Sequence, residues 1–278
     1  MSAIGHLAGT PWAKACVRVL SEGMTGDATG VYLVSSTVLQ VSPPAFPTVI
    51  REAVQKAKAA RVALGPWLGD VIIDPLDEWE MNGVTCALFE QLSPIPVGRF
   101  KRLLELNRVT PHVLGWLRQV AAVSREQNTA TEACLRGLKS SPYDFLREAA
   151  GQALSTLSEG NFRPRATVMH GDFWTGNILL DPAGSREFVV IDWRGCVVEG
   201  HAIFDLIKFA ESAGLGPRLL HRELSEHARV LDCTLAETRI YLLAALGHIW
   251  LNLDQFPPDR FAAMARRNLQ TLDRALHA

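Results

Sequence analysis

Hydrophobic positions in the first ninety residues form short runs separated by polar and turn-forming residues, a pattern typical of β-strands. These runs predict strands at residues 17–20, 31–34, 37–41, 71–73 and 84–89. Residues 49–64 are rich in Ala, Arg, Lys and Glu and predict a helix between the third and fourth strands. The first third of the chain is therefore expected to combine a sheet with one helix.

The spacing of apolar residues becomes helical in most of the remaining chain. It predicts helices at residues 204–213, 217–231, 235–253 and 259–276. Two further helix starts are predicted by a capping residue followed by proline, at Thr110-Pro111 and Ser141-Pro142. Apolar runs at residues 166–169, 178–180 and 188–191 predict three strands, and the turn composition of residues 181–184 makes the last two a hairpin.

Composition excludes several classes of protein. The 278 residues are 48% hydrophobic and 21% charged with a net charge of −1, so neither a nucleic-acid nor a membrane partner is expected. The five cysteines are scattered without a Cys-x-x-Cys pair, which predicts reduced thiols in a cytoplasmic protein. The N-terminus lacks the apolar core of a signal peptide, and no apolar run is long enough to span a bilayer.

The strongest chemical signal begins directly after the strand at 166–169. His170-Gly-Asp172 is followed by Asn177, and Asp192 comes at the end of the hairpin. Because the hairpin returns the chain to its start, Asp192 is expected to lie near Asn177. Phosphoryl transfer needs a group that orients the attacking hydroxyl and oxygen ligands for Mg²⁺. The kinase signature His-Arg-Asp has its Asn at the same spacing, although Gly171 replaces the Arg here.

These residues resemble the aminoglycoside phosphotransferase and choline kinase group of small-molecule kinases. The resemblance is carried by residues 170–180, 190–193 and 200–206. It implies that Asp172 is the catalytic base, that Asn177 and Asp192 bind Mg²⁺, and that Asp205 supports the catalytic loop. His170 is interpreted as a structural support in preference to a proton-transfer group.

The coarse layout also fits this group, which implies an α+β, two-lobed protein-kinase-like fold. Residues 1–92 would form a small antiparallel-sheet N-lobe that covers the nucleotide. Residues 93–278 would form a larger, mostly helical C-lobe with the catalytic loop, the metal site and the acceptor site. The implied function is ATP- and Mg²⁺-dependent transfer of the γ-phosphoryl group to a hydroxyl of a small molecule.

The nucleotide-binding residues expected in the N-lobe match the kinase pattern less closely than those of the C-lobe. A glycine-bearing loop with Gly23 and Gly26 joins the first two strands, but it lacks the Gly-x-Gly-x-x-Gly spacing of kinases. Glu90 and Leu92 begin a proline-marked segment where an adenine would meet backbone groups. On the third strand, Gln40 stands where kinases place the lysine that pairs with the phosphates.

The absence of that lysine leaves alternatives open. A cation from the following helix, Lys56 or Lys58, could reach the phosphates in its place. Alternatively, the strand register differs from the one assumed, or the protein is a degenerate pseudokinase that binds a nucleotide or a partner. The intact set of Asp172, Asn177 and Asp192 favours an active enzyme.

The acceptor is expected to be a small hydroxylated metabolite, and the sequence leaves its identity and the oligomeric state open. Trp250 and Asp254 share a helix face and could hold a cationic group, although a core position for Trp250 is the preferred interpretation. Residues 194–278 contain ten acidic and ten basic side chains, which disfavours a polycationic acceptor. Arg194 is expected to pair with a nearby carboxylate, for example Glu199.

Overall fold

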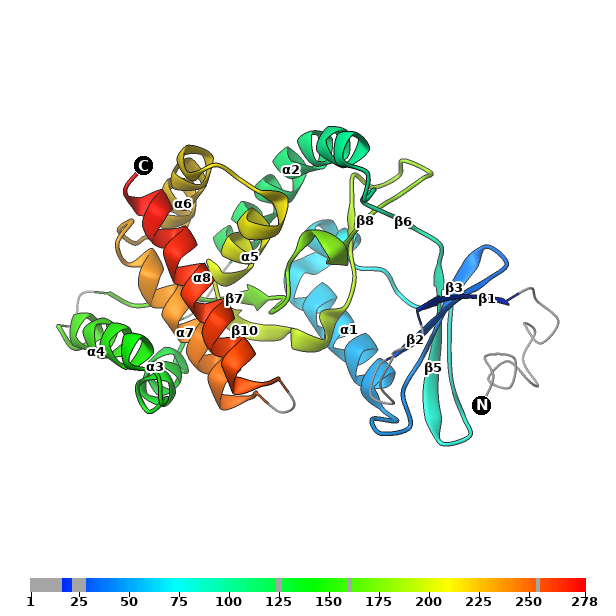
Figure 1. Cartoon of the computed structure of the whole chain (residues 1–278), viewed down its shortest axis with the longest axis horizontal. Coiled ribbons are helices and arrows are strands. Elements are labelled where there is room, and N and C mark those ends of the chain that lie inside the picture. The colour runs from blue at the N-terminus through cyan, green and yellow to red at the C-terminus, as the bar shows by residue number, and fades with distance from the viewer. Residues whose placement is uncertain (1–16, 22–28, 124–126, 160–161, 254–255) are drawn as a thin grey trace.

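A computed structural model describes residues 17–21, 29–123, 127–159, 162–253 and 256–278. Its N-terminal part is a five-stranded antiparallel sheet with the order β1-β2-β3-β5-β4. The strands are β1 (Val17–Ser21), β2 (Gly30–Val34), β3 (Thr37–Val41), β4 (Asp77–Met81) and β5 (Val84–Glu90). Figure 1 shows this sheet at one end of the molecule and most of the helices at the other.

The two faces of the sheet bury different sets of side chains. Alternate residues of β3, such as Leu39 and Val41, pack with Cys86 and Leu88 of β5 in one cluster. On the other face, Ala87 packs against the start of the helix α1 (Val49–Leu68). Because strand residues alternate between faces, the period-2 pattern of the sequence places Gln40, which pairs with Ala87, on the face that α1 covers.

Helix α1 contacts both parts of the protein. Its first turns pack Ile50 and Val54 against the sheet, whereas Ala57, Ala60 and the later apolar positions belong to the large core of the helical part. The helix bends at Gly65, which has a φ of 75° and precedes Pro66. In Figure 1, α1 lies between the sheet and the other helices.

The larger part is mostly helical. Its long helices are α2 (Arg99–Ala122), α3 (Thr131–Lys139), α4 (Asp144–Ser158), α5 (Phe204–Ala213), α6 (Pro217–Leu231), α7 (Thr238–Leu251) and α8 (Pro258–Leu276). Together they enclose a continuous core to which Phe173, Phe204, Phe209, Tyr241 and Phe261 contribute fully buried rings. No helix in the described ranges is sufficiently long and apolar to cross a membrane.

Two small sheets lie among these helices, and their strands flank the loops that carry Asp172, Asn177 and Asp192. Strand β7 (Ala166–Met169) pairs with β10 (Val197–His201), and β8 (Ile178–Leu180) pairs with β9 (Val189–Val190) and β6 (Ser93–Pro94). The Gly184 N–H donates to the carbonyl oxygen of Asp181 at 3.0 Å and closes the expected hairpin turn. The predicted α+β fold, with a small antiparallel sheet and a larger helical part, is therefore confirmed.

Several local predictions are wrong. Residues 71–73 are not a strand, because Gly69–Val71 form a 3-10 turn and only Ile72 makes a bridge, to Val190. Pro111 lies inside α2, so Thr110 does not start a helix. Helix α4 starts at Asp144 with Tyr143 as its N-cap, two residues beyond the predicted position.

Candidate active site

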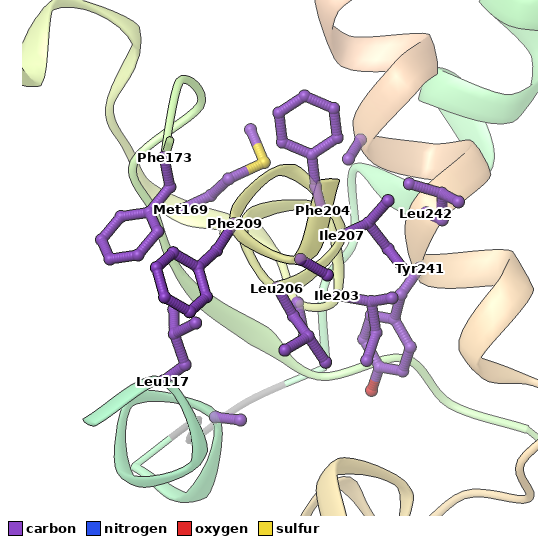
Figure 2. Close-up of a cluster of buried hydrophobic side chains, with 14 of the residues drawn as sticks. Leu117, Met169, Phe173, Ile203, Phe204, Leu206, Ile207, Phe209, Tyr241 and Leu242 are labelled. Atoms are coloured by element: carbon purple, nitrogen blue, oxygen red, sulfur yellow. The ribbon is translucent and has the colours of Figure 1, made fainter. Parts of the chain in front are cut away.

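Residues 170–177, the predicted catalytic loop between β7 and β8, are anchored by Phe173, directly after Asp172. The Phe173 ring is fully buried and stacks on Trp116 of α2 with ring centroids 5.6 Å apart. It also meets Phe209 of α5 edge to face at 6.1 Å, and Figure 2 shows these two rings side by side below Met169. An apolar residue inside a polar loop therefore fixes the loop against two helices, which leaves its neighbour Asp172 half-exposed.

A buried carboxylate holds the backbone at the start of this loop. Asp205 Oδ2 accepts from the N–H of His170 at 2.6 Å, and its Oδ1 accepts from the N–H of Gly171 at 3.1 Å. Burial raises the pKa of Asp205, and these two hydrogen bonds act in the opposite direction by favouring the carboxylate. Ile203, two residues earlier, has a φ of 75°, a conformation that is costly for a β-branched residue and is found where the surrounding structure enforces it.

His170 joins the catalytic loop to the end of the hairpin. Its Nδ1 accepts from the Asp172 N–H at 3.2 Å, which makes Nε2 the protonated nitrogen that donates to the Ile191 carbonyl oxygen at 2.9 Å. The imidazole is buried and packs on Trp193 at 4.7 Å. Because both ring nitrogens have partners inside the fold, the geometry favours the structural role that the sequence suggested.

The backbones of the catalytic loop and the following loop approach each other closely at two glycines. Gly171 has a φ of 82°, and a Cβ placed on it would lie 2.5 Å from the carbonyl oxygen of Gly195. Gly195 ends the 3-10 turn Trp193–Gly195 that begins directly after Asp192. Only glycine fits this approach without displacing one of the two loops.

Asp172 and Asn177 meet inside the loop. The Asn177 amide donates from Nδ2 to the carbonyl oxygen of Asp172 at 2.9 Å and to its Oδ2 at 3.3 Å. The other carboxylate oxygen, Oδ1, lies 3.3 Å from Nζ of Lys208 on α5. Lys208 is not among the residues predicted from the sequence, although its position three residues after Asp205, on the same helix, was an available signal.

Asn177 also lies beside the residue that precedes Asp192, because its carbonyl oxygen accepts from the Ile191 N–H at 3.0 Å. Since Nδ2 of Asn177 is committed to Asp172, its Oδ1 has no hydrogen-bond partner among the described residues and is available as a ligand. Amide and carboxylate oxygens are the protein ligands that Mg²⁺ takes alongside water and phosphate. The oxygen ligands of Asn177 and Asp192 are therefore of the type that fits Mg²⁺, which would replace Arg194 as a partner of the Asp192 carboxylate.

Asp192 is held by the arginine two residues later. Arg194 Nε donates to Oδ1 of Asp192 at 2.8 Å and its Nη2 donates to Oδ2 at 3.2 Å. The hydrogen bond to Asp192 raises the pKa of Arg194 above its ordinary value, and the negative charge of Asp172 acts in the same direction. Arg194 thus pairs with a nearby carboxylate as expected, but the carboxylate is that of Asp192 and not that of Glu199.

The two lysines considered as substitutes on α1 have different partners. Lys56 Nζ donates to the carbonyl oxygen of Arg194 at 2.6 Å and so lies against the loop that carries Asp192. Lys58 pairs with Glu78 of β4 at 3.6 Å. Gln40 faces α1 but has no side-chain hydrogen bond within the described ranges, and Glu52 accepts from the Thr48 hydroxyl at 2.7 Å.

Of the remaining predicted nucleotide-binding residues, Glu90 and Leu92 lie on the segment between the two parts. Glu90 ends β5 and forms an ion pair with Arg186 of the β8–β9 turn, and Leu92 is buried. Ser93 and Pro94 then pair with β8, which places this segment next to the hairpin. Gly23 and Gly26 lie outside the described residues.

Side chains elsewhere in the described ranges do not form a metal site of their own, because no group of three or more His, Cys, Asp or Glu residues there is arranged to bind a metal. Trp250 packs on Tyr143 and Phe261 as part of the helical core, and Asp254 lies outside the described residues. The described cysteines Cys86, Cys134, Cys196 and Cys233 are free thiols.

The fold is of the kinase-like class, because it combines a small antiparallel sheet with a larger helical part. Two neighbouring loops carry Asp172, Asn177 and Asp192. The family model described as "Phosphotransferase enzyme family" matches residues 101–239, half of the chain. The protein therefore belongs to this phosphotransferase family.

Solved structures agree with this assignment at the level of the fold. A point mutant of aminoglycoside 2′-phosphotransferase IIIa in complex with GDP is 13% identical, with a TM-score of 0.60 over 96% of this chain and 95% of its own. A ternary complex of aminoglycoside phosphotransferase APH(4)-Ia with ADP and hygromycin B is 15% identical, with a TM-score of 0.59 over 93% and 94%. Choline kinase LicA from Streptococcus pneumoniae is 14% identical, with a TM-score of 0.55 over 92% and 94%. No curated protein matches the sequence.

Proposed function

We propose that this protein transfers the γ-phosphoryl group of ATP to a hydroxyl of a small molecule, with Mg²⁺ bound by Asn177 and Asp192. The observation that carries the proposal is the contact of Asn177 with both Asp172 and the backbone that leads into Asp192. One amide thereby connects the group that would orient the acceptor with the group that would hold the metal. Membership of the phosphotransferase family supports the same reaction class.

In this reaction the acceptor oxygen attacks the γ-phosphorus, and the bond from that phosphorus to the oxygen that bridges it to the β-phosphate breaks. ADP leaves, and the hydroxyl proton passes to the Asp172 carboxylate. When bound, Mg²⁺ would neutralise charge on the phosphate oxygens. The chain contributes by positioning the reacting groups. Asn177 and Lys208 fix the Asp172 carboxylate, and Asp205 fixes the backbone at the start of the loop that carries Asp172.

A degenerate, non-catalytic protein is the competing function, and Gln40 is its main support. The position of Lys56 weakens that argument, because its ammonium lies at the loop that holds Asp192 and carries the charge that Gln40 lacks. A chain that only bound a nucleotide would not require Asp172 to be held by both an amide and an ammonium group. The active enzyme is therefore the function that we infer.

The test of this proposal is Asp172→Asn, assayed by ADP release against a panel of hydroxylated metabolites. The Asp172 side chain is 49% exposed, so its replacement should leave Tm and Mg²⁺–ATP affinity close to those of the wild type. General-base groups contribute roughly 10²–10⁴-fold, and the acceptor-dependent rate should fall by about this factor. A variant that folds, binds ATP and keeps more than about a tenth of the wild-type rate would refute the assignment of Asp172 as the base.

A further inference from the structure

A large pocket opens beside the catalytic loop, on the side of the helical part. Its volume is about 580 Å³, which is within the usual range for small-molecule sites. It is lined by the end of α5, the start of α6 and one face of α8, and Trp174 of the catalytic loop forms part of its wall. The Trp174 side chain is 44% exposed although it is large and apolar.

The charge of this pocket is mainly positive. Three of its lining side chains are basic, Lys208, Arg267 and Arg274, and one is acidic, Glu211. Glu211 already accepts from Asn268 Nδ2 at 2.9 Å. This excess is local, because residues 194–278 as a whole contain equal numbers of acidic and basic side chains.

The two arginines keep their charge available for a ligand. Arg267 and Arg274 are both exposed and lie seven residues apart, two turns along one face of α8. Arg274 donates to Gln270 and Thr271 of its own helix, and neither arginine pairs with a carboxylate among the described residues. A binding partner with negative charge would therefore not have to displace an existing ion pair.

Lys208 connects the pocket to the site of phosphoryl transfer. Its side chain is 19% exposed, lines the pocket, and places Nζ 3.3 Å from Oδ1 of Asp172. A hydroxyl held at Asp172 would thus have a cation beside it and a basic cavity behind it. The geometry joins a reacting group to a site for the remainder of the acceptor.

We propose that this pocket binds the acceptor and selects a hydroxylated molecule that carries an anionic group, a carboxylate or a phosphate. The hydroxyl lies at Asp172, where Lys208 stays paired with the carboxylate, and the anionic group lies between Arg267 and Arg274. The same lining disfavours a cationic acceptor such as choline, because like charges would be brought together with little compensation. This inference rests on the proposed phosphotransferase function and adds the class of acceptor to it.

The experiment compares matched acceptors with the full-length protein. Glucose, gluconate and glucose 6-phosphate present hydroxyls with no charge, a carboxylate and a phosphate, and glucosamine and choline supply the cationic comparison. ADP release with saturating Mg²⁺–ATP gives kcat and KM for each compound. A kcat/KM highest for gluconate or glucose 6-phosphate is the expected result, and the higher of these two distinguishes carboxylate from phosphate recognition.

Variants then connect the preference to the pocket. Arg267→Gln and Arg274→Gln should each raise KM for the anionic acceptor by about five- to thirtyfold, as expected for charged hydrogen bonds at a partly exposed site. Their kcat and Mg²⁺–ATP affinity should change little, because neither residue contacts Asp172, Asn177 or Asp192. The matched control is Arg266→Gln, since this neighbouring arginine stacks over Phe145 at 4.4 Å and does not line the pocket.

The outcomes separate this inference from the proposed function. Preference for a neutral or cationic acceptor, or equal KM values in Arg267→Gln and Arg266→Gln, would overturn the anionic class while leaving the phosphotransferase in place. If no compound were phosphorylated, calorimetry with gluconate and glucose 6-phosphate would test the pocket directly. Binding that Arg267→Gln and Arg274→Gln abolish would support an anion site without the proposed activity, and no detectable binding to the wild type would overturn it.

Discussion

Gly171→Ala tests whether the close approach of the two loops at the candidate active site controls its chemistry. The new Cβ would lie 2.5 Å from the Gly195 carbonyl oxygen, whereas ordinary van der Waals contact begins near 3.4 Å, so the loops would have to separate by almost 1 Å. The positive φ of 82° adds about 1–2 kcal/mol of backbone strain, and forced packing adds about 1–3 kcal/mol. The combined loss of stability, about 2–5 kcal/mol, corresponds to a fall in Tm of roughly 4–10 °C for a chain of this size.

The functional effect should exceed the effect on stability. A displacement of about 1 Å between catalytic groups can reduce a rate by about 10²-fold, and the Gly195 loop begins at Asp192. We therefore expect a weaker Mg²⁺ dependence of ATP binding, measured by calorimetry, and acceptor-dependent ADP release reduced by about two orders of magnitude.

The matched control is Gly184→Ala in the β8–β9 turn. Gly184 has a similarly positive φ of 68°, but no atom lies within 4 Å of the position that a Cβ would take there. It should lose only the strain component, about 1–2 kcal/mol, and keep wild-type kinetics. If Gly171→Ala and Gly184→Ala had the same Tm and the same ADP-release rate, the close approach would have no functional importance and this reasoning would be wrong.

Three other substitutions, one of them a control, test how the nucleotide and the metal are held. Lys56→Ala should weaken Mg²⁺–ATP binding by about tenfold, because the Lys56 ammonium lies at the Asp192 loop. Lys58→Ala is the control and should leave the affinity unchanged, because it removes only a contact to Glu78. Equal ATP affinities of the two variants in calorimetry would exclude Lys56 as the missing cation. Asp192→Ala should remove the Mg²⁺ dependence of ATP binding while the protein stays folded. A Mg²⁺ titration indistinguishable from that of the wild type would refute the metal-site assignment.

Much of the local structure could be predicted where the pattern and the turn chemistry agreed. The third strand and helices α5 and α6 have the predicted bounds, because alternation and helical spacing are strong there and Gly214, Gly216 and Pro217 mark the ends. Strand β4 was missed because its sequence, Asp-Glu-Trp-Glu-Met, is mostly polar and exposed, and its pairing with β5 alone defines it.

Helix α2 shows the opposite error. Pro111 suggested a helix start, yet the helix continues through it, because burial of Val109, Val113 and Leu117 on one face outweighs the lost backbone hydrogen bond. The local signal of the proline was thus overridden by packing against distant parts of the chain, which a short stretch of sequence does not reveal. The start of α4 shifted for a smaller reason, since Tyr143 adopts the extended cap conformation after Pro142.

The residues of the candidate site also fall into those that local sequence could place and those whose position depends on packing. Asp172, Asn177 and Asp192 lie on one strand–loop–hairpin unit of some twenty residues, so their proximity followed from turn signals alone. The position of Lys56 depends on how α1 packs against that unit, and no local pattern contains this information. Lys208 lies one helical turn after Asp205, so its spacing was a local signal, but its contact with Asp172 depends on the packing of α5. The roles of Lys56, Asp172 and Asp192 remain predictions that the proposed variants test. The roles of Lys208 and Asn177 and the boundary after residue 92 also remain predictions.

Under the proposed function, the packing of α1 has a consequence for nucleotide exchange. The sheet meets α1 through the apolar contact of Ile50 and Val54 with Ala87 and also through polar contacts. The Ile50 N–H donates to the Ser42 hydroxyl at 3.1 Å, and Arg51 and Lys58 pair with Glu80 and Glu78 of β4. The later turns of the helix are part of the extensive core of the helical part. A movement of the sheet would therefore be transmitted along α1 to Lys56, whose ammonium contacts the Asp192 loop, so that exchange of ADP for ATP would be coupled to the position of that loop.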